Sequence, residues 1–396
     1  MARVLQIIPS LHTGGAEQAC LDVAMHLTEV GSEAFVVSCG GPGVELLDEA
    51  GVRHICRPVN SKNPLLMVAN ALWLAHFARE NRVNVIHARS RAPAWSAYLA
   101  SLIAGCAFVT TFHAAYHFSS DNTAGRCKKL YNGVMARADR IIAISEFIAS
   151  HIREHYSDLA GDRLRVVPRG VDFEALAPER VNEERLETLR LAWRVAPGET
   201  LILLPARLSR LKGHAVFIEA MRQLPERCGH AKAVLLGGDP GRSPYGRELM
   251  RMIEDFGLRD RVVLADACSD MAAAYRLASL VVAPSVAPEG FGRVPIEAMA
   301  MGVPVIASRL GGFAETIRDG ETGWLVRPDD PQELAKSIAQ VLEMLDSQRS
   351  AVVERAKNES RTHYDKRRMV ADTLAVYDEA IRARRQETHD ARAKRR

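Results

Sequence analysis

The residues from Ala283 to Ala307 constrain the fold more tightly than any other part of this sequence. The segment APSVAPEGFGRVPIEAMAMGVPVIA begins at the end of a short apolar run and finishes with another, Val303–Ala307. Between them, a loop rich in proline and glycine precedes a helical pattern from about Pro295 to Met301, which Gly302 ends. Proline early in a helix and glycine just past its end are the usual arrangement. Strand, loop, helix and strand in this order predict a parallel crossover.

Two carboxylates flank the loop of this unit. Glu289 stands in the loop and Glu297 in the helix that follows. Loops that leave the carboxyl ends of parallel strands form the ligand crevice of such sheets. The amides from Gly290 to Gly292 are expected at a helix N-terminus, where unpaired N–H groups favour an anion. The pattern suits a ligand with hydroxyls at both ends and phosphate between them, such as a nucleotide sugar. The alternative is two solvated glutamates around an ordinary turn.

Apolar runs and helical patterns alternate along most of the chain, which predicts a doubly wound α/β architecture. A stretch with Pro168, Gly170 and Pro178 interrupts the alternation and separates two domains. Towards the carboxyl terminus we expect long helices over Gln332–Leu345 and from Ser350 to about Arg384. We place the boundaries at 1–168 for the first domain, 169–182 for a linker, 183–362 for the second domain, 363–385 for a terminal helix and 386–396 for a basic tail.

Composition excludes several other classes of protein. With 396 residues, 47% of them hydrophobic and 25% charged, the chain is expected to fold into two or three packed domains. Its net charge of +4 does not favour a nucleic-acid partner. Seven scattered cysteines without a Cys-x-x-Cys motif predict neither a disulfide framework nor a zinc site, and they fit a cytoplasmic location. No apolar run has the length of a signal-peptide core or a membrane span.

The tail from Arg382 to Arg396 is dominated by arginine. Two interpretations are open for it. It is either a solvated helix end or a patch that docks on an anionic membrane surface. The second interpretation would make the protein peripheral at the inner face of the cytoplasmic membrane.

Two cations lie in another loop that is expected at a strand end. Arg207 and Lys212 follow the apolar run Leu201–Pro205 within the segment ARLSRLKGH. Two such cations could clamp a diphosphate, which leaves with extra negative charge. Because Arg210 stands between them, a solvated basic loop is the competing interpretation.

The motifs together resemble a known family. EGFGRVPIEAMAMGVPVIA resembles the Glu-x7-Glu signature of family 4 retaining glycosyltransferases, and the resemblance extends over nearly the whole chain. The resemblance implies a GT-B fold, in which two doubly wound Rossmann-like domains face a cleft and the last helix crosses back onto the N-terminal domain. We expect the stretch Tyr364–Tyr377 to make this crossing. PRGVD resembles the family's Pro-Asn-Gly-Val-Asp linker, with Arg169 in place of asparagine.

The resemblance also implies roles for individual residues. Arg207 and Lys212 would bind the diphosphate, Glu289 the hydroxyls of the donor sugar and Glu297 the ribose. Backbone amides would come from Gly290, Phe291 and Gly292.

The first domain would contribute three further residues to the donor. Gly14 and Gly15 follow the first expected strand and would let the backbone approach the phosphate, although most Gly-Gly pairs only turn the chain. His113, in TFHAAYH, would lie near the donor sugar; a structural histidine is the alternative.

The implied mechanism is transfer with retention, in which the departing diphosphate takes the proton of the incoming hydroxyl. It requires neither a protein nucleophile nor a metal or other cofactor, and the sequence contains no Asp-x-Asp motif of the metal-dependent type. Two rivals remain open: a nucleotide-sugar epimerase of the same fold and a nucleotide-sugar-binding protein without turnover.

The donor and acceptor are suggested by a narrower resemblance. HARSRAPAWSAYLA (His87–Ala100), TFHAAY and PRGVDF resemble bacterial lipopolysaccharide-core glycosyltransferases, mannosyltransferases among them. This implies GDP-mannose as donor and a lipid-linked or lipopolysaccharide-core saccharide as acceptor, with a UDP-sugar donor as the alternative. Arg89 and Arg91 would then meet an anionic acceptor, or else they are surface arginines.

Overall fold

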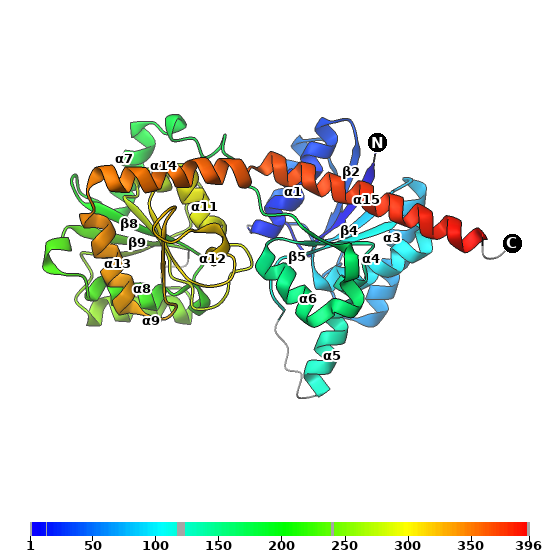
Figure 1. Ribbon diagram of the computed structural model, residues 1–396, viewed down its shortest axis with the longest axis horizontal. Coiled ribbons are helices and arrows are strands. Elements are labelled where there is room, and N and C mark those ends of the chain that lie inside the picture. The colour runs from blue at the N-terminus through cyan, green and yellow to red at the C-terminus, as the bar shows by residue number, and fades with distance from the viewer. Residues whose placement is uncertain (1, 13, 117–122, 239–240, 394–396) are drawn as a thin grey trace. The chain divides into compact units, whose positions relative to one another are not determined.

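The computed structural model describes residues 2–12, 14–116, 123–238 and 241–393, which fall into two compact units (Figure 1). Unit 1 contains Met1–Gly170 and Lys366–Arg396, and unit 2 contains Val171–Asp365. The stretch expected to link the domains therefore belongs to unit 2 from Val171 onward. Residues 394–396 of the expected basic tail lie outside the described residues.

Unit 1 is built on a parallel sheet with the strand order β3-β2-β1-β4-β5-β6-β7. The chain leaves β1 towards one edge of the sheet and returns to the other side of β1 with β4. Doubly wound sheets bind ligands at such a switch point, beside the carboxyl ends of the strands. The strands are β1 (Arg3–Ile7), β2 (Glu33–Ser38), β3 (Arg53–Cys56), β4 (Val85–Ala88), β5 (Ala107–Phe112), β6 (Arg140–Ala143) and β7 (Leu164–Val166).

Helices cover this sheet with apolar faces. In α1, for example, Ala19, Val23 and Leu27 follow the helical period and are buried. The helices of unit 1 are α1 (Gly15–Glu29), α2 (Gly43–Glu49), α3 (Pro64–Glu80), α4 (Arg91–Ala104), α5 (Thr123–Asn132), α6 (Glu146–Ala160) and α15 (Lys366–Ala393).

Unit 2 repeats the same plan with a parallel sheet in the order β10-β9-β8-β11-β12-β13. Here β8 and β11 lie side by side at the switch point, with Ile202 opposite Leu280. The loops that follow these two strands therefore emerge next to each other. The strands are β8 (Thr200–Pro205), β9 (Ala231–Leu236), β10 (Val262–Ala265), β11 (Leu280–Ala283), β12 (Val305–Ser308) and β13 (Trp324–Val326).

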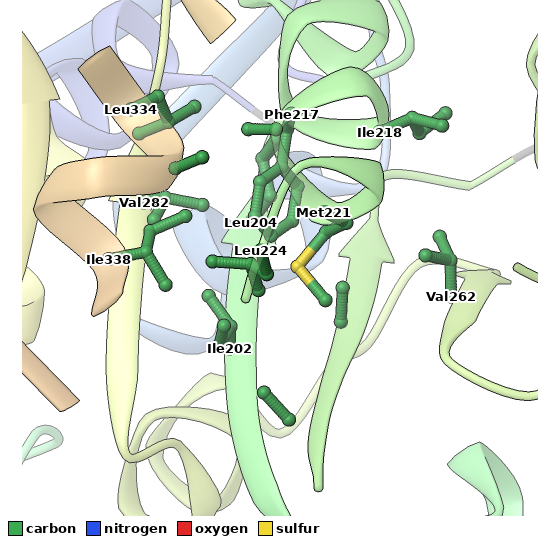
Figure 2. Packing of buried hydrophobic residues seen from close by; sticks show 14 of the residues in the cluster. Ile202, Leu204, Phe217, Ile218, Met221, Leu224, Val262, Val282, Leu334 and Ile338 are labelled. Carbon is green, nitrogen blue, oxygen red and sulfur yellow. The ribbon is translucent and has the colours of Figure 1, made fainter. Parts of the chain in front are cut away.

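The core of unit 2 lies between this sheet and its helices. Figure 2 shows side chains of α8 and α13 gathered around β8, among them Phe217, Met221, Leu334 and Ile338. Each such side chain contributes roughly 1.5–3 kcal/mol on burial. The helices are α7 (Glu183–Trp193), α8 (His214–Arg222), α9 (Pro244–Asp255), α10 (Met271–Leu277), α11 (Arg293–Ala300), α12 (Phe313–Thr316), α13 (Pro331–Glu343) and α14 (Asp346–His363).

The structure divides the long helix that the sequence predicts from Ser350 to Arg384. It ends α14 at His363 and begins α15 at Lys366. The break coincides with backbone pairing to a distant segment, because the Val171 amide donates to the Tyr364 carbonyl (2.8 Å) and Val171 forms a bridge with Asp365. The prediction of one continuous helix was therefore wrong.

The last helix packs on unit 1, as the fold class predicted. Tyr377 of α15 is fully buried, and its hydroxyl lies 2.7 Å from His87 Nδ1 in β4. On the same helix, the Glu379 carboxylate forms ion pairs with Arg140 and Arg165. The predicted return of the terminal helix to the N-terminal domain is confirmed.

Candidate functional site

An ion pair joins the two loops at the switch point of unit 2. Lys212 Nζ, in the loop after β8, lies 2.5 Å from Glu289 Oε1, in the loop after β11. Ser285 Oγ donates to the same carboxylate oxygen at 2.8 Å and is itself almost completely buried. The Lys212 and Glu289 side chains are 28% and 21% exposed, so a ligand could still reach them. The sequence indicated both charged residues but not Ser285.

Close backbone contacts hold these two loops in register. Gly213 has φ +73°, and a Cβ there would lie 1.8 Å from the Pro284 carbonyl oxygen. Beside it, the Val286 amide donates to the Leu211 carbonyl at 2.9 Å. Glycine is required at position 213 both by its conformation and by this approach. Lys212 and Glu289 therefore meet because their backbones are locked together.

A buried histidine supports the loop after β8. The ring nitrogens of His214 lie 3.2 Å from the Ala206 carbonyl oxygen and 3.3 Å from that of Ser209. Burial lowers the pKa of His214 below 6.5, although both carbonyl contacts act in the opposite direction. His214 thus fixes the segment that carries Arg207.

The three cations of this loop differ in their surroundings. Arg210 forms a bidentate ion pair with Glu248 and lies over the Tyr245 ring at 4.8 Å. Arg207 is exposed, and its side chain has no ion pair or hydrogen bond with the part of the chain that the structure describes. The interpretation as a solvated basic loop therefore applies to Arg210. That interpretation does not apply to Lys212, which forms an ion pair with Glu289.

Glu297 has polar partners of its own. The Tyr275 hydroxyl donates to Glu297 Oε2 at 2.7 Å, and the Arg293 guanidinium lies 2.8 Å from Glu297 Oε1. Burial and the neighbouring carboxylate raise the pKa of Tyr275 well above 10. Tyr275 and Arg293 orient a carboxylate whose side chain is only 15% exposed.

The glycine-rich loop packs mainly against its own unit. Gly292 has φ +83°, and a Cβ there would lie 2.2 Å from the Phe313 ring. Phe291 is 4% exposed and meets Tyr364 edge-on, with ring centroids 5.5 Å apart. The Gly312 amide donates to the Glu289 carbonyl at 2.8 Å. The close backbone approach at Gly292 is therefore to Phe313 of the same unit.

The predicted donor residues of unit 1 lie at the ends of β1 and β5. Gly14 precedes α1 with an extended backbone (φ 179°), so its conformation does not require glycine. A Cβ there would meet only the flexible Glu17 carboxylate. Gly15 is the first residue of α1, whose N-terminus favours an anion. These three predicted residues, Gly14, Gly15 and His113, belong to a different unit from the other predicted site residues.

His113 has a hydrogen bond with the Arg169 guanidinium. Burial, reinforced by the charges of Arg169 and Arg89, holds the pKa of His113 well below 6.5. The imidazole is therefore neutral and accepts this hydrogen bond. Arg169, which replaces the asparagine of the resembled motif, is 5% exposed and positions His113.

Arg89 and Arg91 both have roles within the fold. Arg89 is 3% exposed and donates through Nε to Gln6 Oε1 at 2.6 Å. Arg91 lies over the Tyr116 ring at 4.2 Å and donates to Asn132 at 3.3 Å. The interpretation of Arg89 as a surface arginine is therefore wrong.

The described residues contain no group of three or more His, Cys, Asp or Glu side chains that could hold a metal ion. Among them, no helix has the length and apolar character needed to cross a membrane. A cavity of about 560 Å³ lies between α7 and the segment after β10, and Arg207, Lys212, Glu289 and Glu297 do not line it.

Two Rossmann-like units, with charged loops meeting at the switch point of the second, define a protein of the GT-B class. Comparison with solved structures agrees. A glycosyltransferase from Rickettsia africae is 30% identical, covers 96% of this chain and 98% of its own, and superposes with a TM-score of 0.86. Anabaena HepE in complex with UDP-glucose is 26% identical, with 95% and 100% of the two chains covered and a TM-score of 0.79.

Two family models match this chain, one in each half. The model described as Glycosyltransferase Family 4 matches residues 13–175, and that described as Glycosyl transferases group 1 matches residues 187–359. The chain belongs to the glycosyltransferases; its C-terminal part matches the group 1 model and its N-terminal part the family 4 model.

Curated relatives match over a shorter stretch. The D-inositol 3-phosphate glycosyltransferase of Xylanimonas cellulosilytica is 32% identical over 255 residues, which are 62% of this chain and 60% of that relative. A relative of the same name from Salinispora tropica is 31% identical over 65% of this chain and 54% of its own length. The chain thus spans little more than half the length of these two relatives.

Proposed function

We propose that this protein is a retaining glycosyltransferase that moves a hexose from a nucleotide sugar to a saccharide acceptor without a metal ion. The contact between Lys212 and Glu289 carries the proposal. In this contact, a cation and a carboxylate lie side by side at the carboxyl ends of two neighbouring strands, and we assign the carboxylate to the sugar. Family membership and the UDP-glucose complex of HepE support a nucleotide-sugar donor.

In the reaction, the bond between the anomeric carbon and the diphosphate breaks. A bond from the acceptor oxygen forms on the same face of the sugar, and the acceptor proton passes to the departing diphosphate. Lys212 and Arg207 stabilise the negative charge that develops on the diphosphate. Glu289 orients the sugar through its hydroxyls, and Glu297 binds the ribose. The cations provide the neutralisation that a metal ion provides in other transferases.

The favoured donor is GDP-mannose and the favoured acceptor is a lipid-linked or lipopolysaccharide-core saccharide. The resemblance of His87–Ala100 to lipopolysaccharide-core mannosyltransferases supports this choice. A UDP-sugar donor is the second candidate, and the UDP-glucose complex of HepE favours it. The names of the curated relatives point to acceptors that carry a phosphate.

A thermal-shift panel tests the donor first. GDP, UDP, GDP-mannose and UDP-glucose are compared at equal concentrations, and GDP-mannose is expected to raise the melting temperature most. Glu289→Ala should bind the nucleotide but fail in transfer. A shift with none of these compounds would contradict the proposal.

Product analysis then separates the proposal from its rivals. Acceptor-dependent release of GDP with an α-linked product identifies a retaining transferase. Conversion of the nucleotide sugar without acceptor would identify an epimerase, and binding without turnover a non-catalytic protein. Turnover should persist in EDTA; strict dependence on a divalent ion would contradict the role given to Lys212 and Arg207.

A further inference from the structure

The solvent-exposed side of α4 is entirely apolar. Its exposed residues are Leu99, Leu102 and Ile103. A helix on the surface of a globular protein normally places polar side chains at such positions. These leucine and isoleucine side chains therefore form a surface that needs an explanation.

The neighbouring helix α3 continues this surface. Leu65, Val68 and Leu72 are spaced so that they share one face of α3, and they are 82%, 51% and 58% exposed. Figure 1 shows α3 and α4 next to each other in unit 1. The two helices are joined at both ends of their contact. Ser96 Oγ donates to the Met67 carbonyl at 2.9 Å, and the Arg79 guanidinium donates to the Ile103 carbonyl.

We call these six side chains the apolar ridge: Leu65, Val68, Leu72, Leu99, Leu102 and Ile103. Contiguous exposed apolar patches on soluble proteins mark sites of interaction. Among the described residues, the other seven exposed large hydrophobic residues lie elsewhere in unit 1 or on unit 2: Val30, Leu46, Leu130, Leu191, Leu211, Met250 and Leu345.

The segment that contains the ridge is strongly basic. Residues 51–120 include six arginines and one lysine but a single acidic residue, Glu80. The net charge of this segment is therefore larger than the +4 of the whole chain. Arg89 is buried, but the other cations of this segment still outnumber Glu80. A positive surface of this kind disfavours pairing with a second copy of itself and favours an anionic partner.

A basic cavity adjoins the C-terminal end of the ridge. It has a volume of about 460 Å³ and is lined by Ala104 and Gly105 at the end of α4. On its other side stand Arg384, Arg385 and His389 of α15. Cationic side chains next to an apolar helix face suit a surface that is apolar below and anionic above, as a phospholipid bilayer is.

We propose that the apolar ridge docks this protein on the surface of an anionic phospholipid bilayer. The ridge side chains enter the boundary between head groups and acyl chains. Arg385 of the adjoining cavity contacts lipid phosphates, while Arg384 pairs with Asp139 and Glu387. This inference goes beyond the proposed function, because docking requires neither the donor nor transfer, and it would bring the enzyme to a lipid-linked acceptor.

Vesicle flotation of the full-length protein tests the proposal. Vesicles of phosphatidylcholine alone are compared with vesicles of equal parts phosphatidylcholine and phosphatidylglycerol. We expect flotation with the anionic vesicles only. The paired substitution Leu65→Ser and Leu72→Ser should weaken it about tenfold or more, and Leu102→Ser should act in the same direction. Arg385→Gln should weaken binding at low salt and lose its effect at high salt.

Matched controls come from unit 2. Leu191 and Leu345 are 71% and 67% exposed, so Leu191→Ser with Leu345→Ser removes comparable apolar surface and should float as wild type does. Failure of the wild-type protein to float with anionic vesicles, or unchanged flotation of the ridge variants, would overturn the proposal. A lipid-free dimer that the ridge variants dissociate would also overturn it, by making the ridge an interface between copies. Thermal shifts with nucleotides report donor binding separately.

Discussion

Lys212 Nζ lies 2.5 Å from Glu289 Oε1, although 77 residues separate the two in the chain. Glu289 is therefore the anionic partner of the Lys212 ammonium group. A diphosphate that arrives at this loop competes for the same ammonium group, while Ser285 continues to hold the carboxylate. In the proposed site, Lys212 thus exchanges one anionic partner for another.

Removal of Lys212 should reduce turnover by roughly 10²–10³, equivalent to about 3–4 kcal/mol of transition-state stabilisation. Arg210→Ala is the matched control, since it removes a cation two residues away whose partner is Glu248 on the surface. It should change turnover less than about fivefold. Steady-state kinetics of both variants test whether Lys212 stabilises the diphosphate. Equal losses of turnover in the two variants would contradict this role.

Gly213→Ala should destabilise unit 2 by more than about 3 kcal/mol, because the new Cβ meets the Pro284 backbone. Gly198→Ala is the control: Gly198 also has a positive φ (+87°), but no atom lies within 4 Å of its ideal Cβ. That variant should lose only the roughly 1–2 kcal/mol of the left-handed conformation. Urea unfolding measures both, and similar losses would show that the approach to Pro284 is unimportant.

Tyr275→Phe should raise the KM for the donor about tenfold with little change in kcat. The substitution removes the hydroxyl that orients Glu297 and leaves the aromatic ring in the core. A hydrogen bond to a charged group contributes about 1.5–3 kcal/mol. A fall in kcat at constant KM would instead indicate that Glu297 acts on the reacting atoms.

Stability should fall on acidification below about pH 6.5, and His87 should account for part of the loss. Burial, with the charges of Arg89 and Arg169, holds the pKa of His87 well below 6.5 in the folded protein. The unfolded chain takes up a proton as the pH falls through about 6.5, whereas the folded chain does not. Acid therefore favours unfolding, by at most about 1.4 kcal/mol per pH unit for one histidine.

His87→Gln should flatten this dependence, with urea midpoints compared between about pH 7.5 and about pH 5.5. His76→Gln, at an exposed position of α3, is the control and should retain the wild-type slope. An unchanged slope in the His87 variant would assign the acid sensitivity to other buried groups, such as His113 and His214.

The alternation of strands and helices could be predicted from the sequence because its signal is local. The segment from Ala283 to Ala307 forms β11, α11 and β12, close to the expected bounds. The contact between Lys212 and Glu289 was harder to predict from the sequence. It depends on β8 and β11 being neighbours although two strands intervene in the chain.

Features set by distant contacts could not be predicted. Gly292 was interpreted through its sequence neighbours, but the ring it touches belongs to Phe313, twenty-one residues later. Neither proline nor glycine marks the end of α14 in the sequence. The helix ends where the backbone pairs with Val171. Ser285 and Tyr275 are ordinary polar residues in the sequence, and only the fold places their hydroxyls on carboxylates.

The packing of α15 has a consequence for biosynthesis. Met369, Val370, Val376 and Tyr377 belong to the buried core of unit 1, although the ribosome makes them only after the whole of unit 2. Unit 2 is one continuous segment and has its residues complete by Asp365. The unit translated first must therefore wait for the final helix before its core closes, and a nascent chain stalled before Lys366 would expose that core to chaperones.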